Sequence, residues 1–220
     1  MRIRARSEKL LDLHFSHSSP YMSEFFGYQL ELLPNVFCPA YGEGSFLMGH
    51  YITHCLDIEE SDVVLDMGTG SGALAILAAN RAATVVASDI SPFAVECANN
   101  NVIRLGFEEK VTILNGDLFE KIEAKNQFSL VFFNAPFMKG KPKNWLEMAL
   151  YDNEYNTLAK FVGNIKYYLR DSGRIYLAFS NCGDTDYLSY LVKNEKINIK
   201  IVQYLSGEIE YYIYELTARK

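Results

Sequence analysis

The chain contains few of the residues that build covalent or metal-bound scaffolds. Its 220 residues include four cysteines, six prolines and a single tryptophan. Cys38, Cys55, Cys97 and Cys182 are far apart and form no CxxC pair, so they predict neither a zinc site nor a dithiol redox centre. We interpret them as reduced residues that take part in packing.

Long apolar runs are absent as well. No segment approaches the roughly 18 consecutive apolar residues of a membrane span. The arginines near the N-terminus are not followed by the apolar run of a signal peptide. These two absences predict a cytoplasmic protein that does not act in a membrane.

Positive charge is in deficit. The chain has 21 Lys and Arg against 27 Asp and Glu, and a formal net charge of -6. Clustered Lys and Arg give a broad phosphate-binding surface its affinity, so no extensive nucleic-acid surface is expected. The basic residues that do gather form two short stretches: Arg2, Arg4, Arg6 and Lys9, and Lys139, Lys141 and Lys143. We interpret these as a solvated tail and a solvated loop, and a local basic patch stays open.

From residue 62 onward, short β-rich runs alternate with longer helical stretches. This alternation is typical of a parallel sheet with helices on both faces, and the length suits one α/β domain. The expected strands are 63–66, 84–89, 111–114, 128–133 and 174–180. The expected helices are 72–80, 92–105, 154–169 and 185–193, the second with Ser91 as its N-cap and Gly106 at its end.

The last two β-rich runs, 197–205 and 209–217, are joined by a short Ser-Gly-Glu connection that favours a hairpin. A hairpin places one antiparallel strand in an otherwise parallel sheet. The predicted fold class is therefore α/β, with a doubly wound, seven-stranded and mostly parallel sheet over residues 61–220. Residues 1–60, rich in aromatics, Ser and His, are assigned to an N-terminal helical extension that covers the site. Its aromatic residues are expected to form its buried face: Tyr21, Phe25, Phe26 and Tyr28.

Residues 66–72, DMGTGSG, place an acid at a strand end and three glycines in the turn that follows. Glycines let the backbone pass close to a ligand, so a nucleotide-like ligand is implied. The turn alone is ambiguous. Gly68, Gly70 and Ala73 also fit the G-x-G-x-x-G/A pattern of dinucleotide sites, with Asp89 near the ribose-binding distance.

Two acids favour S-adenosyl-L-methionine over a dinucleotide. A carboxylate at Asp66 would repel a pyrophosphate, but it can hold the cationic amino acid end of the methyl donor, directly or through water. Asp117 follows the third strand, where a carboxylate can accept a hydrogen bond from an adenine amino group. With Asp89, these acids fall at the carboxyl ends of strands, where open α/β sheets bind ligands. The alternative is that they only cap turns.

Two motifs carry a resemblance to a known family. Residues 66–72 resemble the first motif of class I S-adenosylmethionine-dependent methyltransferases. Residues 134–137, NAPF, resemble the Asn-Pro-Pro-Tyr/Phe turn of amino-group methyltransferases. The chain is most similar to the HemK-type group, which includes release-factor glutamine methyltransferases, and to the related small-domain ribosomal RNA guanine methyltransferases. Residues 36–47 are similar to the stretch of that group that precedes the core and touches the cofactor.

The resemblance covers roughly residues 36–180 and implies a set of site residues. Around the cofactor S-adenosyl-L-methionine it implies Asp66, Gly68 and Gly70 at the methionine end, Asp89 on the ribose and Asp117 near the adenine. It adds Ser45 and Asn134 to the cofactor site. The catalytic turn is Asn134, Ala135, Pro136 and Phe137.

The chemistry of this turn follows from elementary requirements. Methyl transfer is an in-line displacement, so the acceptor nitrogen must be held about 3 Å from the methyl group. The side-chain oxygen of Asn134 and the backbone carbonyl of Ala135 can accept both hydrogens of an NH2 group, which leaves the lone pair facing the donor. Phe137 can stack on a flat acceptor. Ala135 stands where the family turn usually has proline, so the carbonyl is kept but the rigidity is not.

These features predict an N-methyltransferase that acts on a planar amide or amino nitrogen. The acceptor stays open between a protein side chain such as glutamine, an RNA base and a small molecule. Two other functions stay open: a non-catalytic S-adenosylmethionine-binding subunit and an NAD-dependent oxidoreductase. No metal site is expected, because the four histidines lack a third ligand at a suitable spacing. They are His14, His17, His50 and His54.

Overall fold

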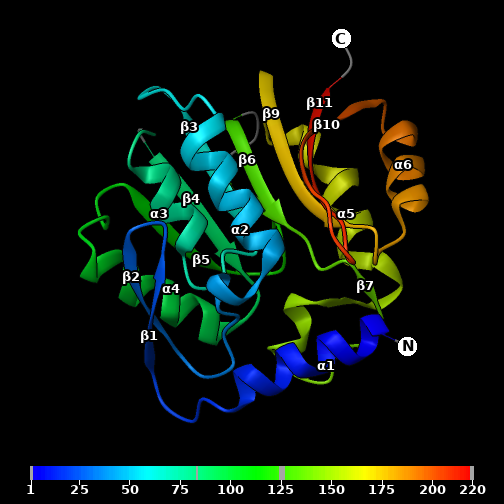
Figure 1. The fold of residues 1–220 in the computed structure, drawn as a ribbon. Coiled ribbons are helices and arrows are strands. Elements are labelled where there is room, and N and C mark those ends of the chain that lie inside the picture. Colours follow the sequence, from blue (N-terminus) through cyan, green and yellow to red (C-terminus); the bar gives the residue numbers. More distant parts are fainter. Residues whose placement is uncertain (1, 83, 124–126, 219–220) are drawn as a thin grey trace.

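The computed structural model describes residues 2–82, 84–123 and 127–218. Its main sheet contains seven strands: β3 (Val63–Met67), β4 (Thr84–Asp89), β5 (Val111–Asn115), β6 (Phe128–Asn134), β9 (Leu169–Ser180), β10 (Ile197–Leu205) and β11 (Tyr211–Ala218). Their order across the sheet is β10-β11-β9-β6-β3-β4-β5 (Figure 1). β11 runs antiparallel to both β9 and β10, and the other pairs are parallel. The predicted fold class is confirmed.

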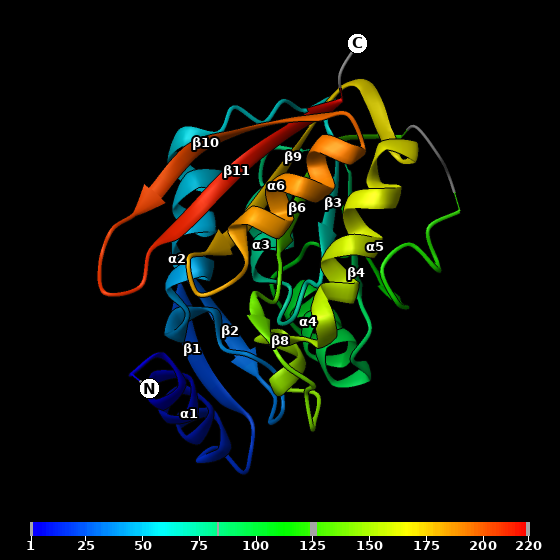
Figure 2. The same ribbon diagram turned by 90° about the vertical axis from the view of Figure 1, so that its right-hand side faces the viewer.

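Helices cover both faces of this sheet (Figures 1 and 2). One face packs on α2 (Glu43–His50), α3 (Ala73–Ala79) and α4 (Pro92–Arg104), and the other on α5 (Asn156–Asn164) and α6 (Thr185–Asn194). Along β6, Leu130 and Phe132 join the first core while Val131 and Phe133 join the second, because successive strand residues point to opposite faces. The almost wholly apolar β6 is thus buried on both sides.

The boundaries of α4 follow the local signals in its sequence. Ser91 is the N-cap, and its hydroxyl accepts a hydrogen bond from the backbone of Ala94 at 3.4 Å. Pro92 is the first helical residue, where its missing N–H costs nothing. Beyond the end, Gly106 has a φ of +76°. This predicted helix is confirmed to within one residue.

Two elements differ from their predicted bounds by five residues at one end. The helix expected over 154–169 is α5, Asn156–Asn164, with a 3-10 turn on each side. Glu154 and Tyr155 have φ values of +53° and +56°, which no α-helix contains. β9 begins at Leu169 rather than at residue 174, because Leu169 pairs with Phe128 of β6 although the residues after it are polar and exposed.

The N-terminal region is only partly helical. It begins with α1 (Arg2–Phe15), followed by an antiparallel hairpin of β1 (Tyr21–Phe25) and β2 (Tyr28–Leu32). The expectation of a helix for the aromatic stretch is therefore wrong. Phe26 and Gly27 both have positive φ, +48° and +84°, which suits a two-residue hairpin loop.

The hairpin and α2 are packed on the main sheet. Phe25, Leu30 and Leu32 are buried in the same core as Leu47 and Met48 of α2. α2 continues into a π-helical turn, Tyr51–Cys55. α1 lies below the sheet in Figure 1, on the side toward which β6 points, and its Arg6 pairs with Glu43 of α2. Within the described residues, no helix has the length and apolar character needed to cross a membrane.

Candidate active site

One continuous cavity of about 590 Å³ lies where β3, β4 and β6 end, and it extends to α1. Nine of the ten site residues predicted from the sequence line it: Ser45, Gly68, Gly70, Asp89, Asp117, Asn134, Ala135, Pro136 and Phe137. The tenth, Asp66, does not. The opposite wall comes from α1 and from residues 138–151. The sheet thus gathers residues from separate loops into one site, as expected for strand ends in an open α/β fold.

The glycine turn after β3 forms the floor of the cavity. Gly68, Gly70 and Gly72 have φ values of +66°, +57° and +83°, a region that glycine adopts readily. At Gly72 a side chain is also excluded by space, because a Cβ there would lie 3.2 Å from the backbone of Ala98. The amides of Gly68 and Thr69 donate to the carbonyl of Ser88 at 2.7 and 3.1 Å. These bonds fix the turn against the end of β4.

Asp66 supports this turn from behind. Its side chain is 1% exposed, and Oδ2 accepts hydrogen bonds from the hydroxyl of Thr69 at 2.6 Å and from the amide of Ala75 at 3.1 Å. Burial raises the pKa of Asp66 to about 7, against the lowering effect of these two bonds. Asp66 therefore shapes the glycine turn rather than lining the cavity.

Asp89, the last residue of β4, borders the cavity with both oxygens already bound. Oδ2 accepts from the amide of Gly70 and Oδ1 from the amide of Ser91, each at 2.9 Å. Burial raises the pKa of this carboxyl, and the hydrogen bonds from backbone amides oppose that effect. Asp89 thereby joins the glycine turn to the start of α4.

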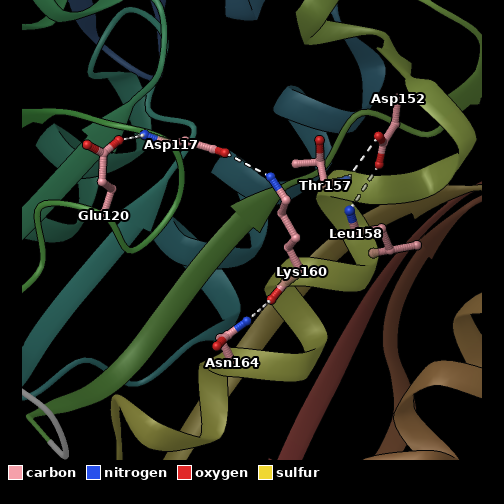
Figure 3. Close-up of polar contacts among 7 residues, drawn as sticks. All are labelled: Asp117, Glu120, Asp152, Thr157, Leu158, Lys160 and Asn164. Carbon is pink, nitrogen blue, oxygen red and sulfur yellow. Dashed lines mark hydrogen bonds and ion pairs between the residues drawn. The ribbon is translucent and has the colours of Figure 1, made fainter.

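Asp117, which follows β5, forms an ion pair with a lysine of α5 (Figure 3). Lys160 of α5 places Nζ 3.0 Å from Oδ2 of Asp117, and the backbone of Asp117 donates to Oε2 of Glu120 at 3.3 Å. The sequence gives no signal for Lys160, because the two partners are 43 residues apart on different elements.

Asp152 is a buried carboxylate that the sequence analysis did not single out. It is 2% exposed, and its two oxygens accept hydrogen bonds from the amides of Thr157 and Leu158, each at 3.0 Å (Figure 3). It belongs to β8 (Tyr151–Asp152), which pairs in parallel with β7 (Met138–Lys139). Asp152 therefore links the first turn of α5 to the chain that follows the 134–137 turn.

Asn134, the last residue of β6, is oriented by α2. Its Nδ2 donates to the hydroxyl of Ser45 at 2.9 Å, and Ser45 is 6% exposed. A Cβ on Gly44 would come within 3.3 Å of Oδ1 of Asn134, so α2 approaches this amide closely. Among the described residues nothing donates a hydrogen bond to Oδ1, which leaves this oxygen available to an NH2 group.

Phe137 ends the 134–137 turn and is held by two other rings. Phe179 and Tyr211 contact it edge-on, at centroid distances of 6.3 and 5.9 Å. Ala135 is 2% exposed and Pro136 is half-buried. Packing around the turn thus limits its movement, although Ala135 stands where the family turn usually has a rigid proline.

The histidines act in packing. His14 of α1 has its Nδ1 2.8 Å from the carbonyl of Leu10, while the amide of Cys38 donates to its Nε2 at 2.9 Å. His50 and His54 lie with ring centroids 4.9 Å apart. In the part of the chain that the structure describes, no group of three or more potential ligands could hold a metal.

Comparisons with known proteins match most of the chain. Residues 28–197 match the model of the methyltransferase small domain family. The chain is 45% identical over 92 residues to a ribosomal protein uL3 glutamine methyltransferase of Bradyrhizobium diazoefficiens, which is 41% of this chain and 28% of that protein. It is 31% identical over 143 residues to a tRNA1(Val) (adenine(37)-N6)-methyltransferase of Porphyromonas gingivalis, which is 61% of this chain and 52% of that protein.

The chain spans about half or less of the length of these two curated relatives. A solved structure, the T. thermophilus 16S rRNA N2 methyltransferase in complex with AdoMet and guanosine, superposes with a TM-score of 0.67 at 21% identity. The match covers 91% of this chain and 50% of that chain, and it shows the fold. The resemblance drawn from residues 66–72 and 134–137 is confirmed, and the chain belongs to the methyltransferase small domain family.

Proposed function

We propose that this chain is an S-adenosyl-L-methionine-dependent N-methyltransferase whose acceptor is a planar amide or amino nitrogen. The observation that carries the proposal is the position of Asn134. Among the described residues none donates to its Oδ1, which lies at the cavity that also contains the glycine turn and Asp89. Membership of a methyltransferase family supports the proposal.

The donor is proposed to lie across the strand ends. The methionine end would lie against the turn from Gly68 to Gly70, where the glycines let the backbone pass close to a ligand. Asp89 would accept the ribose hydroxyls and Asp117 the adenine amino group. The solved T. thermophilus relative contains AdoMet, which supports this donor for the fold. Because Asp117 already pairs with Lys160, adenine binding would share or replace that exposed ion pair, which costs little free energy.

The transfer needs orientation more than acid–base chemistry. The lone pair of the acceptor nitrogen forms a bond to the methyl carbon while the carbon–sulfur bond breaks. The electron pair of the broken bond stays on sulfur and neutralises the sulfonium. Oδ1 of Asn134 and the carbonyl of Ala135 would accept the two N–H groups and aim the lone pair at the methyl carbon. The methylated nitrogen then releases one proton to solvent water.

The relatives support an NH2 group on a planar carbon as the common feature of the acceptor. By their names, one acts on a glutamine of a ribosomal protein and another on an adenine of a tRNA. Both acceptors present such a group. Nothing in the comparisons supports an NAD-dependent oxidoreductase or a non-catalytic subunit that only binds the donor.

The first test uses methyl-labelled S-adenosylmethionine and extract from a strain that lacks the protein. Protease-sensitive label would identify a protein acceptor, RNase-sensitive label an RNA base and acid-soluble label a small molecule. Asn134→Ala should lower turnover while donor affinity is kept, and Asp89→Ala should weaken donor binding. Asn100→Ala, at an exposed position of α4, is the matched control. Full turnover by Asn134→Ala would overturn the proposed role of the turn.

A further inference from the structure

The cavity extends beyond the proposed donor site to a wall built by α1. The residues of this helix that border the cavity are Arg6, Ser7, Lys9, Leu10 and Leu13. Four of them follow a spacing of three or four residues and so form one stripe along the helix: Arg6, Lys9, Leu10 and Leu13. A neighbouring stripe, Ser7, Leu11 and His14, is buried against the protein. α1 therefore presents one face to the protein and the adjacent face to the cavity.

Contacts at several points hold α1 in this position. Leu11 packs with Leu146 and Leu150 in a hydrophobic cluster that is separate from both cores of the sheet. Arg6 forms an ion pair with Glu43 of α2 at 2.5 Å. The cavity wall thus consists of α1 and the 138–151 segment, which are joined by their own small core.

The 138–151 segment contributes the only tryptophan of the chain to this wall. Trp145 is 39% exposed, and among the described residues no other ring stacks on it. Phe137, in contrast, is already contacted edge-on by two rings. An exposed indole face at a cavity is a surface on which a planar ligand stacks. Trp145 is thus better placed than Phe137 to stack on the acceptor.

The two described basic side chains of the α1 stripe differ in their partners. Arg6 is neutralised by Glu43. Lys9 borders the same cavity, and it forms no ion pair or hydrogen bond with any residue that the structure describes. The carboxylates that line the same cavity are bound to other groups: Glu43 to Arg6, Asp117 to Lys160, and Asp89 and Asp152 to backbone amides. Lys9 is therefore left without an ion-pair partner among the described residues. A negatively charged group on the ligand would supply the missing partner.

We infer that Trp145 and Lys9 form the acceptor subsite, and that this subsite takes a planar aromatic ring bearing a carboxylate or a phosphate. Trp145 stacks on the ring, and Lys9 pairs with the anionic substituent. The NH2 group then reaches the catalytic turn from the side opposite the glycine turn. The inference rests on the proposed function, because it assigns the second half of the cavity to the acceptor.

The test uses the fluorescence of the single tryptophan, which reports directly on the subsite. The protein is first saturated with S-adenosylhomocysteine, so that the probes do not enter the donor site. Two pairs of probes differ only in charge: nicotinate against nicotinamide, and adenosine 5′-monophosphate against adenosine. We expect the anionic member of at least one pair to change the emission of Trp145 at lower concentration than its neutral partner. The pair that responds more strongly identifies a carboxylate or a phosphate as the preferred anion.

Two variants separate the contributions. Lys9→Gln should weaken binding of the anionic probe by about twofold to fivefold and leave the neutral probe unchanged. Lys193→Gln, an equally exposed lysine on α6, should change neither. By calorimetry, Trp145→Ala should weaken binding of the ring about fivefold or more. Retained binding of S-adenosylhomocysteine shows that each variant is folded.

Equal affinity for the charged and neutral probes, or no response of Trp145 to any of them, would overturn the inference. Each of these results leaves donor binding and the role of Asn134 intact, so the proposed function would stand. Failure of the protein to bind S-adenosylhomocysteine would instead overturn the proposed function itself.

Discussion

At the scale of single residues, the site depends on two side chains that act through others. Ser45 holds Nδ2 of Asn134 at 2.9 Å, and Asp66 holds the glycine turn through Thr69 and Ala75. From the sequence, both residues were predicted to contact the cofactor. The sequence could not reveal that Asp66 faces away from the cavity, because a carboxylate at a strand end is compatible with either direction.

The hydrogen bond from Asn134 to Ser45 predicts a positioning role for Ser45. Ser45→Ala should lower kcat about tenfold, because the amide of Asn134 then loses the partner that orients it. Donor affinity should be nearly unchanged, and Ser45→Thr, which keeps the hydroxyl, should recover part of the rate. Single-turnover kinetics and donor titration measure the two quantities. A loss of donor affinity with unchanged kcat would instead assign Ser45 to the cofactor.

The raised pKa of Asp66 predicts a dependence of stability on pH. Below about pH 4 its carboxyl is protonated in both the folded and the unfolded chain. As the pH rises from about 4 to about 7, the unfolded chain releases the proton and the folded chain keeps it, so the free energy of unfolding falls by a few kcal/mol. Urea unfolding across this range should show a steeper fall in the natural protein than in Asp66→Asn, because Asp89, whose pKa burial also raises, still contributes in the variant. Parallel curves for the two proteins would contradict the prediction.

At the scale of elements, the sequence predicted what local signals determine. α4 has its own N-cap, a proline at its first position and a glycine beyond its end, so its bounds were predictable. The β1–β2 hairpin was not, because the positive φ of Phe26 is an unusual choice for an aromatic residue and gives no turn signal. The start of α5 was missed for another reason. It depends on Asp152, which caps the helix from a strand that only tertiary packing creates.

The buried cap of α5 should contribute more stability than an exposed cap. Asp152→Ala removes the acceptor of two amides in a position that is 2% exposed, and it should cost about 2 to 3 kcal/mol. Asp184 caps α6 through the amide of Tyr187 but is exposed, so Asp184→Ala should cost about 1 kcal/mol. Thermal and urea unfolding of both variants make the comparison. Equal losses would mean that burial adds nothing to the cap of α5.

At the scale of the whole molecule, the site is complete only when distant parts of the chain meet. The glycine turn and Asn134 come from the sheet, whose strand order brings their loops together, and this half was predictable from the sequence. The other half joins α1 to the 138–151 segment. No local pattern predicted that contact, because Leu11 and Leu146 are 135 positions apart by their numbers and neither lies in a motif.

The attachment of α1 should depend on pH through His14. Burial is the main reason that the pKa of His14 is lowered, and its Nε2 accepts the amide of Cys38, which a protonated ring cannot do. Neutral His14 therefore stabilises the fold fully above the ordinary histidine pKa of 6.5, and this stabilisation is lost as the pH falls through the lowered pKa of His14. Hydrogen exchange, corrected for its intrinsic pH dependence, should therefore show α1 losing protection between about pH 7 and pH 5 while α3 keeps its own.

His50→Gln, which alters a histidine away from α1, should leave this loss unchanged, whereas His14→Gln should remove its pH dependence. If α1 kept full protection at pH 5, His14 would not hold the helix, and Leu11 with the Arg6–Glu43 ion pair would suffice to keep the acceptor wall in place.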